Sequence, residues 1–416
     1  MNFVPYVPRG KTRSGKIVNM DQSVATLGVT MDGVRISPLQ NPPADFTSSR
    51  RLQYDLDSID QYVDRLFLEL AIENTSTTDT ATVNCYSLIE NIRWIDTNKS
   101  EFEVYSYPET GYLIRNMFVD DEEHAVDTNA AYGSGYQSGY KADFSEAVLA
   151  ASSGTLKFYI ELMGPHQQAK FLASSLKGLR LEIYLKVRNV TMSGTDPVSS
   201  LQLVTGDIVG RTHKPLPDIV SQIKAENAKN SQQYSYIGYK NIASEPITVA
   251  ASSEHTIKLT SWLKPSSTMV VLVRPAGVYD NASSNAVDLS NGENLEQIEL
   301  RRANNRIGGF SYANNGTDGS LHLWSADGFS KSKFLGDANG IGMNVLQFAL
   351  DPNAVYEHGV VTGCLGYGDS LADGRSDLYL KFTSGATTGS YQVDVYSIEH
   401  RVLNVGANNF VAYDMF

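Results

Sequence analysis

The sequence predicts an all-β chain that contains a duplicated β domain, and three observations lead to this prediction. Tyrosine (23) and phenylalanine (15) join many threonines and valines, which favours strands, while 33 glycines with many asparagines and serines supply turns. Short segments with alternating apolar residues recur along the chain. Several of them return in the same order roughly 190 to 205 residues later.

The overall composition bounds the possible functions. A chain of 416 residues exceeds what one core usually serves, so two domains are expected. Charged residues make up only 19% and hydrophobic residues 42%, a balance that favours extensive self-association. The net charge of −12 argues against specific nucleic-acid binding, because phosphates are repelled.

The chain begins without an apolar stretch of signal-peptide length and nowhere approaches the length of an apolar membrane span. We therefore expect the protein to be made and to remain in a cytoplasm. The cysteines Cys85 and Cys364 are then expected to be buried free thiols and not a disulfide.

Residues 1–50 are rich in proline, glycine and polar residues without a sustained period, which predicts an extended arm. The arm holds the one basic cluster of an acidic chain, formed by Arg9, Lys11, Arg13 and Lys16. Two interpretations stay open for it: contact with an anionic surface such as lipid, and a solvated tail.

Strands are predicted wherever apolar residues alternate. Residues 65–73 place Leu66, Leu68, Leu70 and Ile72 on one face, and residues 179–187 repeat the pattern. Further strands are predicted at 87–95, 155–163, 269–275, 295–302, 343–350, 377–382 and 391–398. Helices are expected at 166–178 and 215–233, the second as a connector between domains.

The internal echo pairs four segments of the first half with four of the second. Residues 155–165 and 179–187 correspond to 343–353 and 377–382; more loosely, 87–105 and 65–72 correspond to 295–312 and 255–262. We therefore predict an arm at 1–50, a first domain at 51–212, a connector at 213–232, and a second domain with a tail at 233–416.

The segments 65–95, 158–187 and 395–416 carry a resemblance to a known family. In them the chain resembles the double jelly-roll major capsid proteins of tailless, membrane-containing viruses, such as the tectivirus and corticovirus coat proteins, with adenovirus hexon more distant. The ending is similar to that family's short tail with asparagine, glycine and aromatic residues, here Asn404, Gly406, Phe410, Tyr413 and Phe416.

The resemblance implies two tandem eight-stranded jelly-roll barrels with short flanking helices, and a homotrimer that forms a pseudo-hexameric capsomer of an icosahedral capsid, as in a bacteriophage. Implied partners are neighbouring capsomers, penton or minor capsid proteins, and an internal lipid membrane. The protein would lie in the virion after assembly in the host cytoplasm. The basic arm would then face the interior, and loops 120–140 and 280–340 would form the outer crown.

Catalytic and metal chemistry have weak support. The seven histidines form no metalloprotease, zinc-finger or nucleophile pattern, so no enzyme activity and no cofactor are expected. Structural calcium stays possible, although the acidic groups in the predicted loops lack calcium-loop spacing and are expected to be solvated. The acidic groups are Asp120, Asp121, Glu122 and Glu123, which are followed by His124, and Asp318, Asp327 and Asp337.

The three tryptophans leave an alternative function open, a carbohydrate- or receptor-binding β-sandwich of the spike or adhesin type. Trp94 lies inside a predicted strand and is expected in the core, whereas Trp262 and Trp324 could stack on sugars. A polysaccharide hydrolase is the third possibility.

Overall fold

The computed structural model describes most of the chain in segments. These are residues 30–40, 45–46, 50–83, 86–96, 101–111, 114, 147–149, 151–152, 156–167, 173–175, 178–188, 190–194, 196–229, 232–249, 254–259, 266–277, 295–302, 305–311, 343–350, 378–384, 389–405 and 410–414.

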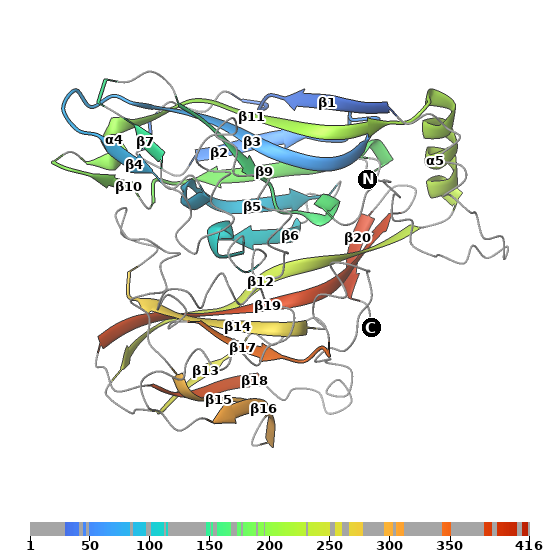
Figure 1. Ribbon diagram of the computed structural model, residues 1–416. Coiled ribbons are helices and arrows are strands. Elements are labelled where there is room, and N and C mark those ends of the chain that lie inside the picture. Colours follow the sequence, from blue (N-terminus) through green and yellow to red (C-terminus); the bar gives the residue numbers. More distant parts are fainter. Residues whose placement is uncertain are drawn as a thin grey trace.

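The first half is a sandwich of two antiparallel four-stranded sheets with a small sheet at one end (Figure 1). The outer sheet has the order β1 (Thr30–Ile36), β11 (Leu201–Lys214), β3 (Tyr62–Asn74) and β8 (Leu156–Glu161). The inner sheet has the order β2 (Arg50–Asp55), β9 (Arg180–Leu185), β5 (Ile89–Ile95) and β6 (Glu101–Ser106). The small sheet has the order β10 (Val190–Met192), β4 (Ala81–Val83) and β7 (Ala147–Leu149).

The second half is a sandwich of the same kind. Its inner sheet has the order β12 (Gln232–Val249), β19 (Gly389–Val405), β14 (Ser266–Pro275) and β17 (Met343–Gln347), and β20 (Phe410–Asp414) also pairs with β19. Its outer sheet has the order β13 (Glu254–Lys258), β18 (Leu378–Ser384), β15 (Leu295–Arg302) and β16 (Asn305–Ser311).

The short helices lie between strands. The first half contains the 3-10 turns η1 (Tyr86–Leu88), η4 (Pro165–Gln167) and η5 (Ala173–Ser175), and the helix α4 (Pro197–Ser200). The helix α5 (Pro217–Lys229) connects the two halves and confirms the connector helix predicted from the sequence.

The two halves have the same strand order. Among the eight main strands of each half, the first pairs with the last, the last with the third, and the third with the sixth. In the second sheet the order is second, seventh, fourth and fifth, again in both halves. This is jelly-roll topology twice over, so the predicted duplication and the double jelly-roll fold are confirmed. Each roll consists of two facing sheets and not a closed ring among the described strands.

Three details differ from the sequence predictions. Strand β1 lies within the range expected to be an extended arm, yet it pairs along its whole length with β11. Segment 65–72 lies in β3, the third main strand of its half, and so corresponds to β14. It does not correspond to the predicted counterpart at 255–262, because residues 255–258 belong to β13, the second main strand. Instead of the predicted helix over 166–178, the described residues there contain the turns η4 and η5.

Alternation explains the core of the first roll. Leu66, Leu68, Leu70 and Ile72 of β3 are fully buried, which confirms the face predicted for them. Trp94 of β5 is also fully buried and its indole N–H donates to the Met163 carbonyl oxygen at 3.1 Å, so the expected core role of this tryptophan is confirmed.

Candidate functional site: the seam between the jelly rolls

The inner sheets of the two rolls lie next to each other and bury a shared surface, here called the seam (Figure 1). Strand β6 of the first roll contacts β12 and β20 of the second. Apolar residues of the second roll belong to the same core as those of the first, among them Tyr239, Leu272 and Ile398. The two rolls are therefore joined by a continuous core.

Strand β14 shows how a sequence produces this two-faced packing. Its residues from Ser266 to Arg274 are all buried. Met269, Val271 and Val273 lie in the core of the second roll, whereas Val270 and Leu272 belong to the core shared with the first roll. An uninterrupted apolar run is typical of a strand that is covered on both faces.

The seam contains buried ionic groups from both rolls. Arg401 of β19 forms ion pairs with Glu103 of β6 and with Glu399 of its own strand. The Tyr236 hydroxyl donates to Glu103 Oε2 at 2.7 Å. Burial, followed by the charge of Glu103, raises the pKa of the Tyr236 hydroxyl well above its ordinary value, so this phenol stays neutral.

A second buried ion pair also connects the two rolls. Arg274 of β14 pairs with Asp394 of β19 and donates to the Thr110 hydroxyl of the first roll at 3.2 Å. The Ser244 hydroxyl donates to the other Asp394 oxygen at 2.6 Å. Arg274, Asp394 and Thr110 are all fully buried, so this contact joins the rolls out of reach of water.

The segment 107–111, which follows β6, is held from both sides. Arg188 binds Glu109 through both terminal nitrogens, at 2.7 and 3.2 Å, while Arg274 binds Thr110 next to it. The Arg188 guanidinium also lies 4.7 Å from the ring centroid of Tyr107, a residue with a φ of +50°. These contacts retain an uncommon left-handed conformation in a residue other than glycine.

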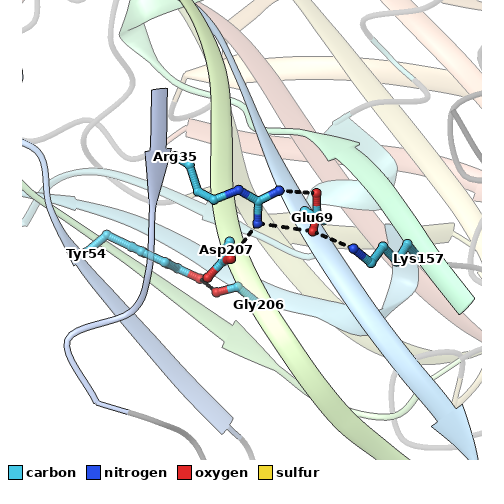
Figure 2. Close-up of polar contacts among 6 residues, drawn as sticks. All are labelled: Arg35, Tyr54, Glu69, Lys157, Gly206 and Asp207. Atoms are coloured by element: carbon cyan, nitrogen blue, oxygen red, sulfur yellow. Dashed lines mark hydrogen bonds and ion pairs between the residues drawn. The ribbon is translucent and has the colours of Figure 1, made fainter. Parts of the chain in front are cut away.

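The outer sheet of the first roll carries a group of ion pairs in which Arg35 and Lys157 are about half exposed and Glu69 is buried (Figure 2). The strand register places Asp207 directly opposite Glu69, an arrangement that is unfavourable for two carboxylates. Arg35 compensates both, at 2.6 Å from Asp207 and 2.8 Å from Glu69, and Lys157 lies 3.3 Å from Glu69. Burial alone would raise the pKa of Glu69, but hydrogen bonds, the one from Arg35 foremost, hold it below its ordinary value.

Beneath these ion pairs, Tyr54 fixes the outer sheet to the inner one. Its hydroxyl donates to the Gly206 carbonyl oxygen at 2.7 Å (Figure 2). A Cβ at Gly206 would lie 2.7 Å from a methyl carbon of Leu52, so this position has no room for a side chain.

Most sequence-predicted site residues lie outside the described residues. These are Arg9, Lys11, Arg13, Lys16, Cys85, Asp120, Asp121, Glu122, Glu123, His124, Trp262, Asp318, Trp324, Asp327, Asp337 and Cys364, together with the predicted crown loop 120–140. The other predicted crown loop, 280–340, contains the strands β15 and β16, so the expectation of one long loop there is wrong for residues 295–302 and 305–311, and the rest of that range lies outside the described residues. Within the described part of the chain, no three side chains of histidine, cysteine, aspartate or glutamate gather as metal ligands. No helix among the described residues is long and apolar enough to span a membrane.

Two jelly rolls joined in one chain define the double jelly-roll fold, and comparison with solved structures finds the same fold in viral capsid proteins. VP54 of PBCV-1, fitted into a reconstruction of the virophage Sputnik, matches with a TM-score of 0.63 and 10% identity over 94% of this chain and 97% of that chain. The Faustovirus major capsid protein matches with a TM-score of 0.57 and 9% identity over 91% of each chain.

A chain of the Sputnik virophage structure matches with a TM-score of 0.54 and 12% identity, over 100% of this chain and 93% of that chain. No family model and no curated protein matches this sequence. At such low identity the likeness establishes the shared fold.

Proposed function

We propose that the chain is a major capsid protein, a structural subunit of an icosahedral virion without catalytic activity of its own. The observation that carries this proposal is the pair of jelly rolls of identical strand order, which are joined in the seam by buried apolar residues and buried ion pairs. Such a subunit is a rigid block with two similar lobes. The matches to these solved structures extend over more than nine tenths of both chains, and the matched chains are capsid proteins. This favours a capsid function over the sugar- or receptor-binding alternative.

We further propose that three copies form a pseudo-hexameric capsomer. Inside the chain, the inner sheet with β6 meets the inner sheet with β12, which leaves the two outer sheets uncovered by the other roll (Figure 1). Because the rolls share one topology, a similar contact between copies would place the outer sheet of the second roll on the outer sheet of the first roll of the next copy. Head-to-tail contacts of this kind close into rings when the rotation allows it.

The partners that go with this function are neighbouring capsomers, penton or minor capsid proteins and an internal lipid membrane. The expected location is the virion, assembled in the host cytoplasm.

The cluster Arg9, Lys11, Arg13 and Lys16 is proposed to contact the membrane or an adjacent capsomer, since each basic residue near anionic lipid contributes about 1 kcal/mol. Deletion of residues 2–16 should leave capsomers intact and impair assembly on lipid-containing particles. Normal assembly of the truncated chain would contradict the role of the cluster.

Light scattering and electron microscopy of the purified chain test the main proposal. The expected species has three times the 45.6 kDa mass of the chain and a six-lobed, threefold outline. A monomer at micromolar concentration would contradict it.

A pair of charge reversals tests the proposed contact. Lys157→Glu changes the outer sheet, whereas Lys224→Glu changes α5; both lysines are about half exposed and each forms one surface ion pair. We expect the Lys157→Glu trimer to dissociate at a higher protein concentration than the Lys224→Glu trimer. If both trimers dissociate at the same protein concentration, the outer sheet of the first roll is not part of the interface.

A further inference from the structure

Two buried carboxylates share a single arginine in the seam. Arg401 Nε and Nη2 donate to Glu399 Oε2 at 3.1 and 2.7 Å, and Arg401 Nη1 donates to Glu103 Oε2. All three side chains are buried, with Glu399 and Glu103 exposed by 0% and 2%. If both carboxyl groups were ionised, this cluster would hold one uncompensated negative charge out of contact with water, which is costly.

The surrounding strands supply few groups that could balance this charge. The titratable groups around the cluster are Tyr105 on β6, Tyr236, Tyr239 and Lys240 on β12, and His400 on β19; Asp414 on β20 occupies the register position opposite Arg401. Burial raises the pKa values of the Tyr105 and Tyr236 hydroxyls, so both stay neutral. Lys240 is only half-buried, and its register partner is Ser397.

The two carboxyl groups are not equivalent. Glu103 Oε2 accepts hydrogen bonds from both Tyr236 and Arg401. Glu399 uses only Oε2, and its Oε1 has no hydrogen-bond partner among the described residues although it is buried. A buried carboxylate oxygen without a partner favours the neutral acid. Glu399 is therefore the group of the pair that is better suited to hold a proton.

We propose that Glu399 retains a proton when the two jelly rolls are docked, so that closing the seam takes up a proton from solution. The proton leaves one negative charge on Glu103 to balance Arg401. The seam is then a pH-sensitive contact that acid strengthens and alkali weakens. Burial, above all, raises the pKa of Glu399 above 4.5, and the charge of Glu103 acts in the same direction, whereas Arg401 opposes both.

The sign of the linkage follows from this raised pKa. The contribution of Glu399 to stability is fully present below pH 4.5 and is lost as pH rises through the folded-state pKa. His400 acts in the opposite direction over part of this range, because burial lowers the pKa of its imidazole to about 4. The experiment therefore compares a variant with the parent at each pH, which cancels the contribution of His400.

The test is the melting temperature of the full chain and of its Glu399→Gln variant between about pH 4 and about pH 9. The amide resembles the protonated acid and cannot titrate. We expect the melting temperature of the variant, minus that of the parent, to rise as pH increases above about 4.5 and then to level off. A difference that stays constant or falls with increasing pH would overturn the proposal.

Glu109→Gln is the matched control, because Glu109 is also fully buried and its two carboxylate oxygens accept from both terminal nitrogens of Arg188. We expect this variant to melt below the parent near neutral pH, since it breaks a buried ion pair. Infrared spectroscopy of the parent provides a readout that does not depend on a folded variant. A carbonyl band of a protonated carboxyl group should be present near neutral pH or below and vanish on alkaline titration; its absence at about pH 5 would refute the proposal.

Discussion

Replacing Arg274 with methionine should be among the most damaging single changes in the described part of the chain. The substitution removes this ion pair from the buried Asp394, whose other oxygen still accepts from the Ser244 hydroxyl, and it removes the hydrogen bond to Thr110 in the other roll. Breaking a buried ion pair in this way costs about 3 to 5 kcal/mol. Against a typical stability of about 5 to 15 kcal/mol, this is a large fraction.

The compensating variant separates charge from packing. Adding Asp394→Leu to Arg274→Met removes the buried carboxylate as well, and we expect the double variant to regain most of the loss, because apolar replacements of buried ion pairs are often neutral or better. Urea unfolding, followed by circular dichroism and by the fluorescence of the buried Trp94, measures the free energy of unfolding. The reasoning is refuted if the single variant lies within about 1 kcal/mol of the parent, or if the double variant is no more stable than the single one.

Three further predictions concern packing, pH and surface charge. Gly164→Ala would place a Cβ 2.3 Å from Trp94 Cζ2 and should cost about 1 to 3 kcal/mol in urea unfolding, whereas Gly33→Ala meets only a backbone oxygen at 3.9 Å and should cost less than 1 kcal/mol. Because the pKa of the buried His400 is lowered from 6.5 to about 4, stability should fall by about 3 kcal/mol as pH drops from about 6.5 to about 4, and His400→Gln should remove this part of the pH dependence. Arg35→Ala, at a side chain that is 53% exposed, should cost about 1 kcal/mol or less at physiological salt, and a much larger loss would mean that the outer sheet depends on this residue.

The sequence predicted the elements with strong local patterns. The alternation in β3 and β9, the connector helix and three of the four paired segments of the internal echo correspond to observed structure, because each rests on a pattern within a short segment. Strand β1 was missed because Asp32, Gly33 and Arg35 interrupt its apolar pattern, and its pairing partner β11 lies about 180 residues away. Its structure therefore depends on a distant strand.

Among the described residues of 166–178, the predicted helix is replaced by the turns η4 and η5 for a related reason. The backbone N–H groups of Ala173 and Ser174 donate to the carbonyl oxygens of Gln61 and Ile59, so these two donors do not contribute to a helical ladder. The buried ionic groups of the seam could not be predicted from the sequence either. Glu103 lies in a strand with alternating residues, where a charged side chain predicts exposure, and only the arrival of the second roll buries it.

The position of β11 and β19 within their sheets has a consequence for synthesis on the ribosome. Each is the last main strand of its roll and is inserted between two strands made much earlier: β11 between β1 and β3, and β19 between β12 and β14. The outer sheet of the first roll is therefore complete once residue 214 has emerged, whereas the second roll cannot close until β19 ends at residue 405, near the end of the chain. While residues 215–405 are being translated, Glu103 and its neighbours stay exposed to water until Arg401 is in place, so the nascent chain presents an unfinished apolar surface throughout that interval.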